Sequence, residues 1–187
     1  MKTISLLRPF ALAGVLLASV PALAADYVQA AGSTLAFASS YDGKIFVGSF
    51  PGFSTTLRFD PADLGSARLD VAIPLAGTRS GNGDRDATLR GPDFLDIARF
   101  ASARYHAEKF RALGGDRYAA DGTLDLHGVS KPVTLTFTWA PGTQPVLAGK
   151  ATVKRLAFGV GQGDWADTGA IPDAVAVSTR VVLKPAD

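Results

Sequence analysis

Residues that could carry acid–base, nucleophilic or metal chemistry are few in this chain, and they are widely spaced. The chain contains no cysteine, which excludes thiol catalysis, cysteine-ligated zinc and iron–sulfur clusters. Its two histidines, His106 and His127, lie on different expected strands and in no ligand-spaced cluster. We expect His106 to face the side of its strand opposite to Tyr105, and His127 to lie exposed in a turn.

Two pairs of carboxylates are the remaining candidates for catalysis or calcium binding. Asp84 and Asp86 follow a Gly-Asn-Gly turn, and Asp164 and Asp167 lie on either side of a tryptophan. Neither pair matches the oxygen-ligand spacing of an EF-hand loop, so we interpret them as solvated loop carboxylates and helix caps. We therefore predict no metal ion, no cofactor and no enzymatic activity. An enzyme that uses Asp84, Asp86 or His106 as acid or base on an apolar substrate is the alternative.

The first 24 residues have the pattern of a secretory signal peptide. Lys2 and Arg8 form a positive segment, an apolar run follows at 10–20, and small residues up to Ala24 form the site that a signal peptidase reads. The apolar run is about half of the roughly 20 residues needed to span a bilayer, so a membrane anchor is the weaker interpretation. We predict cleavage after Ala24, one mature domain at 25–187 and a periplasmic location.

The positive excess of the chain belongs to this first segment. Nineteen lysines and arginines stand against 17 aspartates and glutamates, and two of the bases precede residue 25. The mature domain is therefore neutral, which argues against nucleic acids and anionic membrane surfaces as partners. Because no later apolar run is long enough to span a bilayer, we expect no stable membrane insertion.

The mature sequence alternates apolar and polar residues with the period of a β-strand. The clearest case is 133–139, where apolar residues occupy the odd positions and threonines the even ones. One face of this strand should be buried and the other exposed to water. The same alternation, punctuated by glycine, proline and aspartate turns, predicts strands at 34–37, two within 44–59, and others at 68–73, 103–110, 118–126, 147–156 and 174–183.

One region, 84–100, does not alternate and is expected to be helical. Asp84 could cap a short helix that contains Leu89, and the Gly91-Pro92 pair interrupts it. Pro92 could then begin a second short turn. Eight or nine strands with hairpin-length connections give an all-β domain, either a sandwich or a closed barrel, with a short helical insertion. A closed barrel removes the exposed strand edges.

The interior of such a barrel has two interpretations. A barrel of about eight strands is either filled by its own side chains or holds one slender ligand. Burial of one methylene contributes about 0.8 kcal/mol, so about ten buried carbons would supply about 8 kcal/mol before the costs of association. Composition alone does not decide between a ligand tunnel and a solid core, and a solid core would suit a stress-related interaction module.

Five sequence blocks follow one another in order along the mature domain. They are STLAF at 33–37, GSF at 48–50 with FDP at 59–61, RDATLR at 85–90 leading to DFLD at 93–96, GTLDLHGVSKPV at 122–133, and RLAFG at 155–159. Together they resemble the YceI-like family of bacterial periplasmic proteins over essentially the whole mature domain.

The resemblance implies an extended, lipocalin-like antiparallel β-barrel of about eight strands with a short helical insertion. It also implies an isoprenoid ligand in an elongated tunnel, such as a prenyl quinone or a prenyl pyrophosphate, and, as in many members, a homodimer. Two positions depart from the family pattern: Ala30 replaces an acidic residue, and Gly32 replaces a histidine. Any contact that those two groups make with a ligand head is therefore absent here.

Strand parity within this fold predicts the residues that line the tunnel. They are Leu35, Phe37, Phe46, Phe50, Leu57, Phe59, Leu69, Val71, Ile73, Phe94, Leu95, Leu135, Phe137, Trp139 and Phe158. Arg79, Asn82 and Arg85 are candidates for contacting a polar or anionic head group at the mouth, with an ordinary solvated loop as the alternative. A continuous internal void would separate the lipid-binding hypothesis from the solid core.

Overall fold

Ten strands form one antiparallel sheet in the computed structural model, which describes residues 25–186. The expected signal peptide at 1–24 lies outside the described residues. The strands are β1 (Ala25–Gln29), β2 (Thr34–Tyr41), β3 (Lys44–Ser49), β4 (Ser54–Phe59), β5 (Arg68–Pro74), β6 (Ser102–Gly114), β7 (Arg117–Leu126), β8 (Val129–Ala140), β9 (Val146–Lys154) and β10 (Ala174–Pro185). One α-helix, α1 (Gly83–Arg90), and three short 3-10 helices, η1 (Leu64–Ser66), η2 (Arg155–Phe158) and η3 (Gly163–Ala166), complete the described part of the chain.

The sheet closes into a barrel because its first and last strands pair with each other. Tyr27 of β1 lies opposite Pro185 of β10, while β1 also pairs with β4. The β2–β3 hairpin continues the two strands β1 and β4 beyond a bend, since β2 pairs with β3 and with the first half of β10. The ring therefore contains eight strands, β1-β4-β5-β6-β7-β8-β9-β10. The prediction of an all-β, eight-stranded antiparallel barrel is confirmed.

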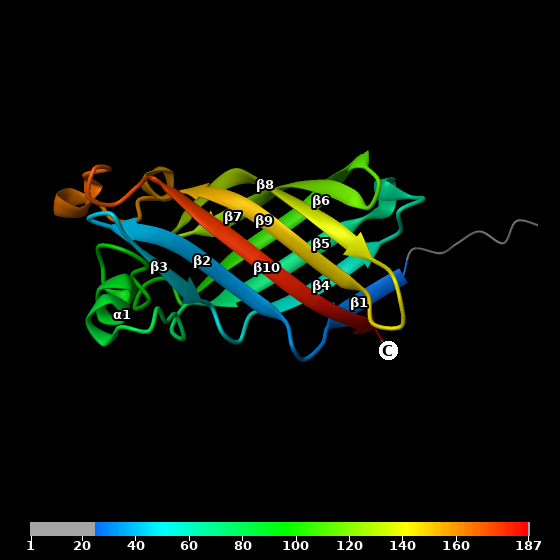
Figure 1. The fold of residues 1–187 in the computed structure, drawn as a ribbon, viewed down its shortest axis with the longest axis horizontal. Helices are drawn as coiled ribbons and strands as arrows, with labels where there is room; N and C mark the ends of the chain where they lie inside the picture. Colours follow the sequence, from blue (N-terminus) through cyan, green and yellow to red (C-terminus); the bar gives the residue numbers. More distant parts are fainter. Residues whose placement is uncertain (1–24, 187) are drawn as a thin grey trace, which may run out of the picture.

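The barrel is elongated, and its two ends differ (Figure 1). Helix α1 and the segment that holds η3 lie at one end, whereas β1 and the carboxyl terminus lie at the other. Strand β1 was not among the predicted strands. No helix within residues 25–186 has the length and apolarity needed to cross a lipid bilayer.

Helix α1 ends just before Gly91, as expected, but it begins earlier than the sequence predicted. Asn82, and not Asp84, is the N-cap, because its side-chain oxygen accepts a hydrogen bond from the backbone N–H of Arg85 at 2.9 Å. Asp84 lies in the first turn, where its negative charge favours the helix dipole. The second short turn expected from Pro92 is observed, since residues 92–95 and 97–99 form turns and Asp96 between them adopts a φ of 42°.

Six aromatic side chains fill the β1 end of the barrel; we call them the aromatic cluster. The ring of Phe59 lies at its centre, with its centroid 5.0 to 6.0 Å from four neighbouring rings, and only 2% of Phe59 is exposed. A sixth ring packs on Trp139 at 5.6 Å. The members are Tyr27, Phe59, Phe110, Tyr118, Phe137 and Trp139. This end of the barrel is therefore closed by tilted and edge-on aromatic packing.

Candidate ligand-binding cavity

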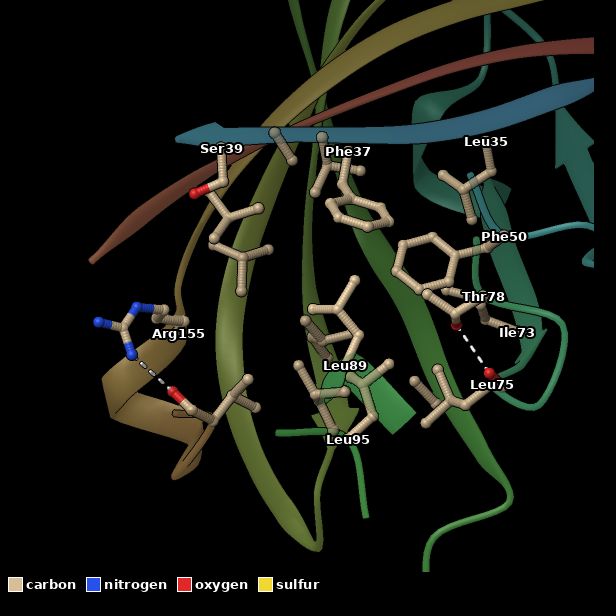
Figure 2. A pocket seen from close by; sticks show the side chains of 18 of the residues that line it. Leu35, Phe37, Ser39, Phe50, Ile73, Leu75, Thr78, Leu89, Leu95 and Arg155 are labelled. Atoms are coloured by element: carbon tan, nitrogen blue, oxygen red, sulfur yellow. Dashed lines mark hydrogen bonds between the residues drawn. The ribbon is translucent and has the colours of Figure 1, made fainter. Parts of the chain in front are cut away.

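A cavity of about 490 Å³ occupies the other part of the barrel, between the aromatic cluster and α1. Its volume lies within the range of about 300–1,000 Å³ that is usual for small-molecule sites. The wall is built from alternate residues of the strands, because successive side chains of a strand point to opposite faces. Strand β5 supplies Leu69, Val71 and Ile73, and β8 supplies Val133 and Leu135. The wall is therefore almost entirely aliphatic and aromatic (Figure 2).

Part-exposed side chains on the inward face show that the interior is hollow. Val71, Ile73, Val133 and Val177 point inward and line the cavity, yet none of them is fully buried. On β8, Phe137 lies in the closed end and is buried, whereas Val133, on the same face, is only part-buried. In a solid core, all inward-facing side chains of a strand would be buried, so this difference in burial favours a hollow interior.

The mouth of the cavity lies between the β2–β3 hairpin and α1. The exposed residues among those that line the cavity are Tyr41 at the end of β2 and Asn82, Asp84 and Thr88 on or beside α1. Arg85 of α1 lies over the ring of Phe46 from β3, with its guanidinium carbon 4.3 Å from the ring centroid. This cation–π contact joins the two sides of the mouth.

Most of the predicted lining residues are brought together around this cavity. Ten of the fifteen line it, namely Leu35, Phe37, Phe46, Phe50, Leu69, Val71, Ile73, Phe94, Leu95 and Leu135. Figure 2 shows Leu35, Phe37, Phe50, Ile73 and Leu95 directed into the space. Asn82 and Arg85 lie at the mouth. Their contact with a ligand stays a prediction.

Six predicted site residues lie outside the cavity wall. Four of them, Leu57, Phe59, Phe137 and Trp139, point inward as parity requires, but they lie at the filled end or beside it. Phe158 is buried in η2 and is likewise not part of the wall. Arg79 instead forms an isolated bridge with Ser49, so it is held along the strand edge.

The sequence reasoning missed several wall residues for which a signal was available. Val175, Val177 and Val181 alternate along β10, and Val153 continues the inward face of β9. Parity along these strands would have found them. Leu89 of α1 also faces the cavity, and Figure 2 shows it across from Phe37.

Arg155 is a buried cation beside the cavity that sequence reasoning did not single out. Only 3% of the residue is exposed, and its guanidinium donates hydrogen bonds to five backbone carbonyls. These carbonyls belong to Val160, Gly161, Trp165, Ile171 and Pro172, at 2.8 to 3.2 Å. Burial lowers the pKa of Arg155 from its ordinary value. The five hydrogen bonds from Arg155 hold the 160–172 loop in place, and Figure 2 shows one of them.

The groups that could act as acid or base do not converge on the cavity. His106 points away from the interior, as expected, and its Nδ1 lies 2.6 Å from a carboxylate oxygen of Asp70 on the outer face. Asp86 is 8% exposed rather than solvated, and it accepts hydrogen bonds from the N–H and hydroxyl of Ser80, both at 2.6 Å. These bonds lower the pKa of Asp86. Asp84 alone of the three proposed catalytic residues lines the mouth.

His127 lies in a turn, but the expectation that it is exposed was wrong. Its ring is half-buried against Phe100, with centroids 4.9 Å apart, and its Nδ1 is 3.2 Å from the carbonyl oxygen of Phe158. The backbone of His127 is in the left-handed region, with a φ of 52°. Within 25–186, no three His, Cys, Asp or Glu side chains are grouped so that they could hold a metal ion.

Solved structures with this fold extend over most of the chain. A crystal structure of Burkholderia cenocepacia BcnA superposes with a TM-score of 0.79 at 28% identity and covers 83% of this chain and 98% of that one. A structure from Saccharophagus degradans, described as a polyisoprenoid binding domain implicated in plant cell wall breakdown, gives a TM-score of 0.67 at 17% identity. It covers 87% of this chain and 99% of that one. The second likeness concerns the fold alone.

Curated sequences give a consistent result. A UPF0312 protein of Vibrio campbellii is 31% identical over 116 residues. The match covers 60% of this chain and 61% of that protein, so it spans about three fifths of the relative's length. A UPF0312 protein of Pseudomonas syringae pv. tomato is 30% identical over 137 residues, or 71% of each chain. The model of the YceI-like domain matches residues 27–183. With this match spanning the barrel from β1 to β10, the chain belongs to the YceI-like family.

Proposed function

We propose that the protein is a periplasmic binding protein that holds one end of a long isoprenoid lipid, such as a prenyl quinone or a prenyl pyrophosphate, inside the barrel. The observation that carries the proposal is the apolar cavity of about 490 Å³, closed at one end by aromatic rings and open beside α1. A blind apolar cavity takes a slender chain lengthwise, and the rest of a longer lipid extends through the mouth.

The energetics of such a site favour binding without any catalytic group. Each methylene transferred from water contributes about 0.8 kcal/mol, so about ten carbons supply about 8 kcal/mol. Association costs at least about 4 kcal/mol, which leaves at most about 4 kcal/mol for ten carbons, a dissociation constant of about 1 mM. A longer buried segment or a polar contact raises the affinity further.

The relatives and the amino-terminal sequence support the ligand class and the location. The Saccharophagus degradans domain with this fold is described as binding polyisoprenoid. The first 24 residues have the charge, apolar run and small terminal residues of a signal peptide, which supports export to the periplasm. A long prenyl lipid is poorly soluble in water, so a protein that shields its chain could carry or store it there.

The test is to identify what the protein holds when it is made in a bacterial host. The full chain is expressed, isolated from the periplasmic fraction without detergent, extracted with organic solvent and analysed by mass spectrometry. We expect prenyl lipid in the extract. Recovery of the protein from the cytosolic fraction would contradict the location, whereas protein without lipid that also takes up no added prenyl lipid would contradict binding.

A matched pair of variants on one strand separates cavity binding from surface adsorption. Val71→Phe places a ring in the cavity, while Ala72→Phe places the same ring on the outer face of β5. We expect Val71→Phe to reduce the bound lipid at least tenfold and Ala72→Phe to retain it. Equal lipid content in the two variants would show that the lipid is bound elsewhere.

A further inference from the structure

Thr55 carries a buried hydroxyl that faces the cavity and has no hydrogen-bond partner among residues 25–186. Only 2% of this residue is exposed. An unpaired buried hydroxyl is unfavourable, because it loses its bonds to water without replacing them. A hydroxyl kept in this state, on the wall of a cavity, is free to bond a ligand.

Thr55 differs in this respect from the other threonines of the cavity. Thr78 donates to the carbonyl of Leu75 at 2.7 Å, as Figure 2 shows, and Thr179 donates to the carbonyl of Thr34 at 2.9 Å. Those hydroxyls are occupied by the backbone. Thr88 of α1 likewise donates to the carbonyl of Asp84 at 3.0 Å. Among the four threonines that line the cavity, Thr55 alone therefore has a hydroxyl without a partner in residues 25–186. The other unpartnered buried hydroxyl of the described wall belongs to Ser39, which lies opposite Phe46 at the mouth.

Thr55 lies near the inner end of the cavity. It pairs with Val71 on β5, and the next inward-facing residue of its strand, Leu57, already lies outside the cavity wall. Phe59 of the aromatic cluster follows on the same face. A ligand atom beside Thr55 is thus at the closed end, far from the mouth at α1.

The groups around this inner end are neutral. Burial raises the pKa of Tyr105 to about 12, and its hydroxyl donates to the carbonyl of Ala120 at 2.9 Å. On the neighbouring strand β1, Gln29 donates its amide to the carbonyl of Phe53 at 2.9 Å. The charged residues that line the cavity are Asp84 and Arg85 at its mouth, and Arg155, whose donors are taken by backbone carbonyls.

The inner end therefore suits a neutral oxygen and not a phosphate. A hydroxyl donor matches a carbonyl or ether oxygen of a ligand. A pyrophosphate placed there would be a buried anion without a cation, which is strongly unfavourable.

We propose that the lipid enters head first, and that the hydroxyl of Thr55 donates a hydrogen bond to an oxygen of a neutral head group such as a quinone carbonyl. The prenyl tail then runs back along the aliphatic wall towards the mouth. This inference rests on the proposed function, since it assigns the orientation and the head-group class of the lipid that the cavity holds.

The test uses three probes that share one prenyl tail: geranyl-1,4-benzoquinone, geranyl pyrophosphate and geranylbenzene. Their binding to the purified mature domain is measured by calorimetry for the wild type, for Thr55→Val and for the control Thr179→Val. Valine keeps the branched shape and removes only the hydroxyl. We expect the quinone to bind more tightly than the other two, and Thr55→Val to weaken the quinone alone, by roughly fivefold, as expected for one neutral hydrogen bond. Thr179→Val should leave the three affinities in their original order.

The infrared spectrum of the bound quinone supplies a second measurement. A hydrogen bond lowers the carbonyl stretching frequency, and we expect this shift in the wild type and in Thr179→Val but not in Thr55→Val. Tight binding of the pyrophosphate, unaffected by Thr55→Val, would overturn the inference by placing the head at the mouth. If no probe binds to the wild type, the proposed function itself fails.

The stability of the free protein distinguishes a purely structural role. If Thr55 bonds the unpartnered Oε1 of Gln29 in the free protein, Thr55→Val should lower the melting temperature and leave quinone affinity unchanged. That result would also overturn the inference. We expect the opposite: an unchanged or slightly raised melting temperature, because the substitution removes an unpaired buried hydroxyl.

Discussion

Removal of the central ring of the aromatic cluster tests how this barrel is closed. In Phe59→Ala the four rings around Phe59 lose a neighbour at 5.0 to 6.0 Å, in a site where 2% of the residue is exposed. A buried phenylalanine changed to alanine costs about 3–5 kcal/mol, and the loss of aromatic pairs places this site at the upper part of that range. In a domain of this size, about 4 kcal/mol corresponds to a fall in melting temperature of roughly 8–16 °C.

The assay is urea unfolding of the lipid-free protein, followed by near-ultraviolet circular dichroism, with the slope of the transition compared between variants. Phe46→Ala is the control, because Phe46 lies at the mouth and is only half-buried. We expect the control to lose less than half of the free energy of unfolding that Phe59→Ala loses. We also expect a long prenyl lipid to raise the melting temperature of Phe59→Ala more than that of the wild type, since the cavity is extended.

A loss of less than about 1 kcal/mol in Phe59→Ala would refute this reasoning. It would mean that the rings at the β1 end are not tightly packed and that the cavity is not blind there. The proposal that one end of the lipid stops at the aromatic cluster would then also fail.

Three further predictions concern the surroundings of the cavity. Arg155→Met leaves buried carbonyls of the 160–172 loop unpaired and should lower the free energy of unfolding by about 3 kcal/mol, with faster hydrogen exchange in that loop. Because the bonds from Ser80 lower the pKa of Asp86 in the folded state, they stabilise the fold above the unfolded pKa of about 3.9 and are lost as pH falls through the folded pKa. Asp86→Asn should therefore flatten the decline of melting temperature below about pH 4. Gly48→Ala would bring a methyl group against the ring of Phe37 and should push that ring into the cavity. We therefore expect the variant to bind geranyl-1,4-benzoquinone more weakly than the wild type in a titration.

Strand parity predicted the direction of side chains well but not their depth along the barrel. Leu135, Phe137 and Trp139 alternate along one strand and all point inward, yet only Leu135 lines the cavity. Parity follows from the pleat of a single strand, so one strand suffices to infer it. Depth depends on the tilt and stagger of all eight strands, which no single segment encodes.

Two other features could not be predicted for related reasons. Strand β1 is only five residues long, and its partners β4 and β10 are distant in sequence. Arg155 has no carboxylate at a recognisable spacing, because its partners are backbone carbonyls, and every residue has one. Thr55, by contrast, shares the parity of Leu57 and Phe59, so its inward position could have been inferred.

The pairing of β1 with β10 also determines when the molecule can fold. The two strands come from opposite ends of the described chain, so the ring is completed by contacts of very large sequence separation. Proteins dominated by such contacts fold slowly, because loop closure must precede the contacts that stabilise it. Until Ala174–Pro185 has been synthesised, β1, β2 and β9 have unpaired edges and the barrel stays open. The closed barrel therefore forms only after β10 has been made, which agrees with the proposed export of the chain before it folds.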